Sequence, residues 1–488
     1  MSWHRKLWVP LLSLLASFAA AVAPAAFARA ADVQWPDTEM GEHARAWFEM
    51  LKADDAGARA FLTAHMAASA LTQVPLEERL DRRRSMLANT GGLTPLEVVN
   101  VDATSISVRC KAGNGDDVMA VFQGEDAAPH KLLGVRLEAG PPGEAPTGPA
   151  GPPLTDREAA NQMRATLDEK SKAGEFSGVA LLARGDATLL SGAWGLADRA
   201  KQTPMTTDTR LNLASIGKLF TRAAIAQLAE AGKLSLDDKL SRYLPDFPHS
   251  DSITIDMLVR HRSGVGDVFN AAFNAMDKSK LRHNRDYLAL IRDQPLWFAP
   301  GTSERYSNGG YVLLGEVVAK ASGEDYYDYL SKHVFAPAGM KSTGYPIQGD
   351  GTPKVARGYT KHDGAEEHDN LSFSPARGSG AGGGYSTAGD LLRFDHALLG
   401  AKLCGPAWSA WVTGGRRPDQ SASAGDTPTD GGFGFAGGAP GISSEWMHEG
   451  DVTLIVLTNR DPEVTKAVMA PLRDTLRRMS PPAKRAGT

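Results

Sequence analysis

The first residues that could do chemistry are a serine and a lysine three positions apart. Ser215 and Lys218 lie in "LNLASIGKLFTRAAIAQLAEAGKLS", whose apolar residues predict a largely buried helix ending near Gly232. Residues three apart share one face of a helix. A serine needs an adjacent base, and a lysine can serve where burial or nearby cations lower its pKa. The pair predicts an activated serine, although Ser is also a common N-cap and S-x-x-K occurs by chance.

A phenol and a carboxamide follow in a second segment, "FAPGTSERYSNGGYVLLGEVVAKASG". Tyr306 and Asn308 belong to a polar loop that leads into an apolar helix, which stops at Gly323. If this loop enters the cleft of the serine, the phenol can relay a proton and the carboxamide can bond a substrate amide. The structural alternatives are an N-cap for Asn308 and a half-buried loop aromatic for Tyr306.

The stretch "FGFAGGAPG", residues 433–441, contains no charged residue and no hydroxyl group. Such small residues either form a turn or let another group approach the backbone closely. We interpret the stretch as an edge strand against which a substrate lies. It can then belong to a site through its backbone N–H groups alone.

In chain order, "SIGK", "YSN" and the small-residue strand resemble the serine β-lactamase and penicillin-binding-protein family, particularly its class C-like branch. The stretches "ITIDMLVRHRSGV", "WFAPGTSERYSNGGYVLLGEVV" and "SGAGGGYSTAGDLLRFDHALL" are also similar to it, and the resemblance covers about residues 157–475. It implies an α+β fold (an α/β sandwich), in which a five-stranded antiparallel sheet flanked by helices lies beside a mostly helical lobe. The site would lie between the two. It also implies acyl-serine chemistry without a metal or a cofactor.

The resemblance assigns roles to the four polar residues. Ser215 would be the acylated nucleophile, and Lys218 would be its base or proton partner. Tyr306 would deprotonate the nucleophile or the hydrolytic water and protonate the leaving group. Asn308 would bond the amide of the substrate. The catalytic set is therefore Ser215, Lys218 and Tyr306.

The third family element falls on Phe435–Ala436–Gly437, and the resemblance makes Phe435, Gly437 and Gly438 substrate-binding together with Asn308. The backbone N–H groups of Ser215 and Gly438 would form the oxyanion hole. Phe435 stands where the family usually has Lys or His. Backbone N–H groups survive a side-chain change, so the hole is retained.

Two properties are lost with the cation that Phe435 replaces. The phenolate of Tyr306, whose ordinary pKa is about 10, becomes harder to form, so Lys218 is the favoured base. A positive group that could hold a substrate carboxylate is also missing, and an aromatic wall favours a neutral, apolar substrate. The prediction is a serine hydrolase that acts on an ester or an amide, related to β-lactamases but esterase- or peptidase-like.

Other functions stay open. One alternative is a D-alanyl-D-alanine carboxypeptidase or a true β-lactamase, since Arg377, Arg416 or Arg417 could supply the missing charge from loops. Solvated loop arginines are the commoner case. The other alternative is a catalytically inactive binding protein, which the intact Ser, Lys, Tyr and Asn argue against.

Composition changes divide the chain. A basic start and an apolar run ending in "ARA" predict a signal peptide, so we expect an exported, periplasmic or secreted protein. Helices followed by strand-like runs predict a small α+β domain, and a Pro/Gly-rich stretch predicts a linker. The expected parts are a signal peptide (1–30), an N-terminal domain (32–138), a linker (139–156), the hydrolase domain (157–478) and a disordered tail (479–488).

The composition limits the partners. The 488 residues carry a net charge of −4, which gives no reason to expect nucleic acid. The apolar stretches leave no membrane span after signal cleavage, and the expected partner is a small-molecule or peptide-like substrate. Cys110 and Cys404 are the two cysteines, and two lone buried thiols are favoured over a disulfide. The oligomeric state is left open.

Overall fold

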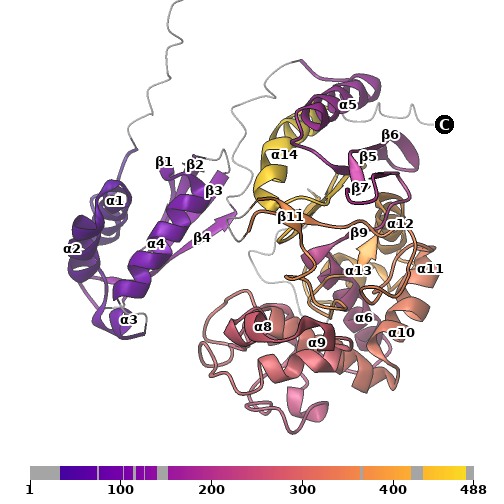
Figure 1. Ribbon diagram of the computed structural model, residues 1–488. Coiled ribbons are helices and arrows are strands. Elements are labelled where there is room, and N and C mark those ends of the chain that lie inside the picture. The colour runs from indigo at the N-terminus through magenta and orange to yellow at the C-terminus, as the bar shows by residue number, and fades with distance from the viewer. Residues whose placement is uncertain are drawn as a thin grey trace, which may run out of the picture. The chain divides into compact units, whose positions relative to one another are not determined.

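The computed structural model describes residues 33–73, 76–102, 104–113, 117–125, 127–139, 152–362, 366–418 and 432–479 (Figure 1). The predicted signal peptide lies outside the described residues, as do residues 140–151 of the predicted linker and 480–488 of the predicted tail. Contacts divide the chain into two compact units, Met1–Thr147 and Gly148–Thr488. Each unit is described by itself.

Unit 1 packs helices on a four-stranded antiparallel sheet with the order β1-β2-β3-β4. Its helices are α1 (Glu39–Lys52), α2 (Asp55–His65), α3 (Ala68–Gln73) and α4 (Leu76–Thr90). Its strands are β1 (Leu93–Val101), β2 (Ser105–Ala112), β3 (Asp117–Gly124) and β4 (Leu132–Ala139). Helix α1 lies against β1, β2 and β3, and the rings of Trp47, Phe48 and Phe122 form the centre of its core.

Unit 2 is built on a five-stranded antiparallel sheet with the order β13-β14-β15-β5-β6, which confirms the predicted fold class. The strands are β5 (Gly178–Arg184), β6 (Ala187–Trp194), β13 (Phe433–Ala439), β14 (Ile442–Glu449) and β15 (Val452–Thr458). Strands from both ends of the unit meet where β15 pairs with β5. The stretch "FGFAGGA" forms β13, at one edge of the sheet as predicted.

Helices cover both faces of this sheet. The terminal helices α5 (Asp156–Lys172) and α14 (Pro462–Arg477) lie side by side on one face (Figure 1). A capping box between Thr155 and Glu158 starts α5. On the other face α12 (Ala388–Leu399) packs against β5 and β15, beside the buried helix α6 (Lys218–Glu230). The sheet therefore separates two apolar cores.

The remaining elements of unit 2 are short, apart from one helix. The helices are α7 (Ile255–Val259), α8 (Ala271–Ala275), α9 (Asn308–Ser322), α10 (Tyr326–Tyr329), α11 (Ala336–Ala338) and α13 (Pro406–Val412). The strands are β7 (Leu196–Asp198), β8 (Thr203–Pro204), β9 (Leu211–Asn212), β10 (Tyr359–Thr360), β11 (His368–Asp369) and β12 (Tyr385–Ser386). Helix α9 packs against both α6 and α7, so it joins the short helix α7 to the buried helix α6 beside the sheet.

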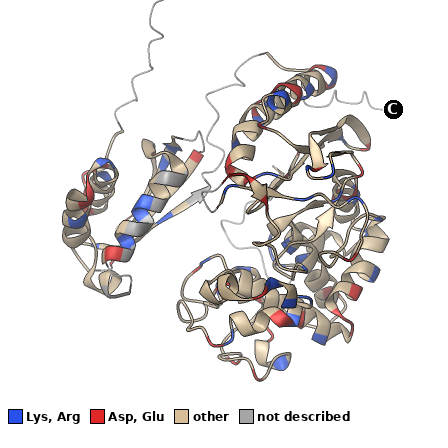
Figure 2. Cartoon of the chain, viewed as in Figure 1, with Lys and Arg blue, Asp and Glu red and all other residues tan. Residues whose placement is uncertain are grey.

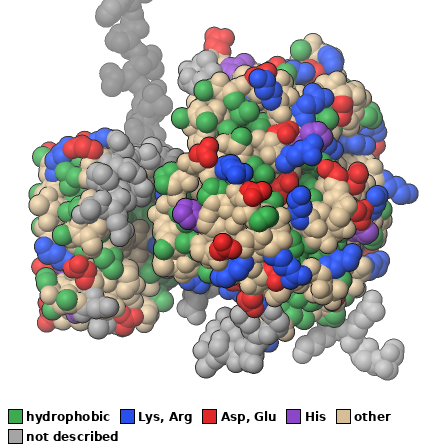
Figure 3. Space-filling model, turned by 90° about the horizontal axis from the view of Figure 1, so that it is seen from below, with side chains coloured by type: hydrophobic (Ala, Val, Ile, Leu, Met, Phe, Trp, Pro, Cys, Tyr) green, Lys and Arg blue, Asp and Glu red, His purple; other side chains and the backbone are tan. Residues whose placement is uncertain are grey.

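Charged residues of both signs are interspersed along the elements of each unit (Figure 2). The face in Figure 3 likewise mixes Lys and Arg with Asp, Glu and apolar side chains. This distribution agrees with the small net charge of −4. Among the described helices, we find none with the length and apolar character that a membrane crossing requires. Cys110 and Cys404 are both buried free thiols.

Candidate active site

The segment around Ser215 makes a tight turn before the buried helix. Ala214 has φ 43°, a left-handed conformation that is strained for a residue with a side chain. The Asn212 side chain holds this turn, since its Oδ1 accepts a hydrogen bond of 2.8 Å from the Ala214 N–H. Ser215 lies in the 3-10 turn Ala214–Gly217, and α6 begins at Lys218. Ser215 is therefore not the N-cap of α6, and the residue is partly exposed.

Lys218 is only 6% exposed and its Nζ has three oxygen partners. It donates to Ser215 Oγ (3.1 Å), Asn308 Oδ1 (2.7 Å) and the carbonyl oxygen of Ala381 (2.6 Å). Burial lowers the pKa of Lys218 to about 7, against the opposing effect of the Asp267 carboxylate. A neutral amine in this position can keep its bonds to Asn308 and Ala381 and aim its lone pair at the serine.

Ala381 belongs to the glycine-rich loop at residues 378–384. That loop passes very close to the nucleophile turn, because a Cβ on Gly382 would lie 2.1 Å from the Ala214 carbonyl oxygen. Glycine is required where two backbones approach so closely. The loop thus supplies a backbone partner to Lys218 and closes the buried side of the site.

Tyr306 contacts Ser215 from the accessible side of the site. Its hydroxyl is 2.7 Å from Ser215 Oγ, and the Lys218 amine lies 4.8 Å from the centre of its ring. The side chain is half exposed, yet burial around the hydroxyl raises the pKa of Tyr306 to about 12. The His261 ring lies 4.6 Å away, and its Nδ1 accepts a hydrogen bond from the Ser307 N–H. Burial lowers the pKa of His261 to about 4, so it supports the loop as a neutral ring.

Asn308 is the first residue of α9, and the N-cap is Ser307, whose hydroxyl accepts from Gly310 N. The N-cap alternative for Asn308 is therefore wrong, and its carboxamide is left for the site. Oδ1 accepts from Lys218, while Nδ2 lies 3.2 and 3.0 Å from the two carboxylate oxygens of Asp267. Sequence reasoning missed Asp267. It lies in "HRSGVGDVF", 41 positions before Asn308. The signal that could have found it was a single acid directly after the uncharged stretch "SGVG".

Strand β13 lies directly beside the nucleophile. A Cβ on Gly437 would lie 2.8 Å from the Ser215 backbone nitrogen and 2.3 Å from the Leu213 carbonyl oxygen. Phe435 is two positions earlier on the same strand and projects from the same face. Its partly buried ring packs near Phe433 (5.6 Å between ring centres) and Trp446 (6.0 Å). The smallness of the stretch thus permits close approach to Ser215, and Phe435 is anchored in an aromatic cluster.

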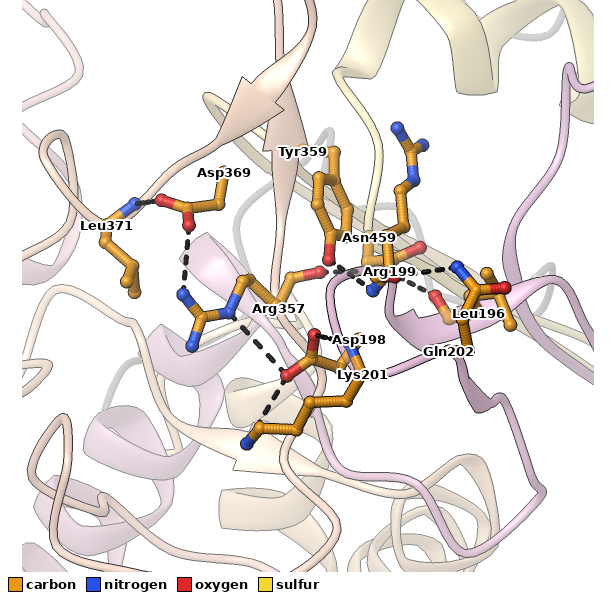
Figure 4. A network of polar contacts seen from close by, with 10 residues as sticks. All are labelled: Leu196, Asp198, Arg199, Lys201, Gln202, Arg357, Tyr359, Asp369, Leu371 and Asn459. Carbon is orange, nitrogen blue, oxygen red and sulfur yellow. Dashed lines mark hydrogen bonds and ion pairs between the residues drawn. The ribbon is translucent and has the colours of Figure 1, made fainter.

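A polar network fixes the loop beside the far end of β13 (Figure 4). Asn459, just after β15, donates to the carbonyl oxygen of Arg357 (2.9 Å), and Arg357 donates to Asp369 (2.9 Å). The next residue, Asn370, donates to the Pro440 carbonyl oxygen (2.8 Å) in the turn that follows β13. The turn is therefore tied to the middle of the sheet, which restrains the strand beside Ser215.

The loop arginines have partners elsewhere. Arg417 is 2% exposed and pairs with Asp237 at 2.9 Å. The Arg377 guanidinium lies 3.6 Å from the centre of the Tyr327 ring. Arg416 is exposed. The interpretation of all three as solvated is wrong for Arg377 and Arg417, because both are held by these contacts and not free to bind a substrate carboxylate.

Comparison with known proteins gives consistent matches for unit 2. The family model described as Beta-lactamase matches residues 163–477. Penicillin-binding protein 4* of Bacillus subtilis is 34% identical over 247 residues, 48% of this chain and 54% of that protein. Esterase EstB of Burkholderia gladioli is 28% identical over 360 residues, 62% of this chain and 90% of that protein.

A solved penicillin binding protein from Bacillus halodurans is similar with a TM-score of 0.55 and 30% identity, covering 64% of this chain and 99% of that chain. The match with the first curated relatives spans about half of their length.

Proposed function

Because the chain belongs to the beta-lactamase family, we propose that it is a serine hydrolase that forms an acyl-enzyme on Ser215 and acts on an ester or an amide. One observation carries this proposal: Ser215 Oγ lies 3.1 Å from the buried Lys218 amine and 2.7 Å from the Tyr306 hydroxyl. Acyl transfer needs a nucleophile within hydrogen-bond reach of a base whose pKa is near neutral. A relative named as an esterase agrees with this reaction class.

In the proposed reaction, neutral Lys218 takes the proton of Ser215 as Oγ attacks the carbonyl carbon of the substrate. The backbone N–H groups of Ser215 and Gly438 hold the negative oxygen that develops. The bond to the leaving group then breaks, and the leaving group takes a proton. Water, activated by the same base, attacks the acyl carbon and releases Ser215 together with the acid product.

Tyr306 acts as a proton donor in this scheme. With a pKa raised to about 12, its phenol stays protonated near neutral pH, so it is better suited to give a proton than to take one. It can hand a proton from Lys218 to the leaving group, because it contacts Ser215 Oγ from the accessible side. Asn308 still has an Nδ2 hydrogen that can bond the amide of a substrate.

The proposed substrate is neutral and apolar on the side that faces β13. Phe435, Gly437 and Gly438 offer it an aromatic ring and backbone but no charge. A second aromatic side chain, Phe269, is 54% exposed on the loop of Asp267, to which its N–H is bonded at 2.9 Å. Apolar walls with few polar groups are what a neutral acyl or alcohol group requires.

Turnover of two chromogenic substrates tests the proposal. We expect a p-nitrophenyl butyrate to be hydrolysed with a kcat/KM at least about tenfold above that of a chromogenic cephalosporin, and Ser215→Ala to abolish both activities. Efficient hydrolysis of the cephalosporin with no activity on the ester would favour a true β-lactamase. No turnover of either substrate by a folded protein would favour an inactive binding protein.

We also propose that residues 1–30 are a signal peptide and that the protein is exported. The basic start and apolar run support this proposal. The N-terminal domain (32–138), the linker (139–156), the hydrolase domain (157–478) and the tail (479–488) stay predictions. In this scheme the N-terminal domain has no catalytic role.

A further inference from the structure

We infer that Asp267 is a positioning residue for the proposed reaction: its carboxylate holds the Asn308 carboxamide with its oxygen toward the Lys218 amine, so that a negative charge lies one side chain away from the base. The inference rests on the proposed function of Ser215 and Lys218. It concerns a residue outside the four polar residues that carry the motifs.

The carboxylate of Asp267 is itself held in place. Its Oδ1 accepts from the Phe269 backbone N–H at 2.9 Å, and its Oδ2 accepts from the Asn308 backbone N–H at 3.1 Å. The Gln294 side chain also donates to the Asp267 carbonyl oxygen at 3.0 Å. A carboxylate with such backbone donors has a fixed direction.

This fixed carboxylate decides which end of the Asn308 amide faces Lys218. A carboxylate accepts only, so it takes Nδ2, and Oδ1 must then point to the amine. The flipped amide would set Oδ1 against the carboxylate and Nδ2 against the amine, which loses both interactions. Without an acceptor at position 267, this choice of orientation is lost.

The same carboxylate is the negative charge that acts on Lys218. The other titratable groups around the amine come from three elements. Arg222 follows on α6, and His261 lies before the Asp267 loop. Tyr306 lies in the loop just before α9, and Tyr311 lies in the first turn of that helix.

His261 is neutral near pH 7, since its pKa is lowered to about 4, and burial raises the pKa values of both tyrosines. Asp267 therefore stabilises the ammonium form of Lys218, and Arg222 is the one fixed cation among these groups.

The pH dependence of Ser215 labelling tests this inference. Lys218 must be neutral to accept a proton, so the labelling rate with a fluorophosphonate rises with pH through the Lys218 pKa. Asp267→Asn removes the negative charge, which disfavours the ammonium, so the midpoint of this rise falls by at least about 0.5 pH. The plateau rate also falls, because the new carboxamide can turn either its oxygen or its nitrogen toward Asn308 and no longer fixes the orientation of that side chain. Asp267→Glu keeps the charge and keeps the midpoint near that of the native protein.

Three further measurements make the result decisive. Asp293→Asn removes the same charge from an exposed side chain of the same lobe and leaves the midpoint unchanged. Asp267→Ser is the second variant if Asp267→Asn fails to fold, and the same shift is expected. The titration of Lys218 in NMR spectra of ¹³C-lysine-labelled protein, assigned with Lys218→Arg, reads the shift without any reaction.

An unchanged midpoint in a folded Asp267→Asn or Asp267→Ser protein, with only a lower plateau, would overturn the inference and leave a merely structural role. Failure of the proposed function is a different result, namely that the native protein shows no Ser215-dependent labelling at all.

Discussion

Adding one methyl group at Gly437 tests whether β13 borders the reacting atoms. In Gly437→Ala the new Cβ would lie 2.3 Å from the Leu213 carbonyl oxygen, 2.6 Å from Ser444 Oγ and 2.8 Å from the Ser215 nitrogen. Two of these atoms are backbone and cannot rotate away. Since carbon contacts are comfortable only near 3.5 Å, β13 or the Ser215 turn must move by about 1 Å.

The expected loss of catalytic activity follows from that displacement. Moving a catalytic group by about 1 Å can cost about 10²-fold in rate, and losing one oxyanion donor costs about 10²–10³-fold. We therefore expect the kcat/KM for an aryl ester to fall by about 10²-fold or more. Overpacking of this kind destabilises by about 1–3 kcal/mol, so the variant still folds, with a melting temperature lower by a few degrees.

Gly434→Ala is the matched control on the same strand. Its Cβ meets Met447 Cγ at 3.9 Å, an ordinary contact, so activity stays within about twofold. The assay is the initial rate of p-nitrophenyl ester hydrolysis, with circular dichroism to verify folding. If folded Gly437→Ala were as active as Gly434→Ala, β13 would not be the strand that holds the oxyanion, and the reasoning would be refuted.

The remaining predictions concern substrate charge and stability. Phe435→His introduces a hydrogen-bonding, protonatable side chain, so we expect the kcat/KM for a carboxylate-bearing ester, relative to that for a neutral ester, to rise about tenfold. Phe435→Leu should leave this ratio unchanged. Equal ratios in the native protein and both variants would contradict the role of Phe435. For His448, burial lowers the pKa, but the bond and charge of the buried Asp395, 3.2 Å away, raise it overall. The pKa of His448 in the folded protein is thus above its value of about 6.5 in the unfolded chain. The pair therefore stabilises the folded protein fully below about pH 6.5, and this stabilisation is lost as the pH rises through the folded-state pKa. The difference in unfolding free energy between the native protein and His448→Gln, from urea titrations, should therefore be larger at pH 5.5 than at pH 9, and a pH-independent difference would argue against the pair.

The parts of the site that were predictable from the sequence are local. Ser215 and Lys218 share a face because helical geometry fixes residues three apart, and the 3-10 turn at Ser215 preserves that relation. Outside the site, the capping box at Thr155 and the hairpin of β5 and β6 also depend only on residues close together in the chain. The edge position of β13 was predicted from its small residues, and the close approach of Gly437 to Ser215 agrees with it.

The parts that escaped prediction depend on tertiary contacts. Asp267 gains its meaning only when the loop before α8 meets the start of α9, and no spacing rule links it to Asn308. The burial of Arg417 against Asp237 joins residues 180 positions apart. A loop arginine is usually solvated, so composition alone gave the wrong environment.

The most direct measurement is the mass of the intact protein after reaction with a fluorophosphonate, followed by peptide mapping. We predict a single phosphonyl adduct on the peptide that carries Ser215, formed faster as pH rises through about 7 and absent from Ser215→Ala. A folded protein that forms no adduct, or that carries it on another residue in both proteins, would contradict the account.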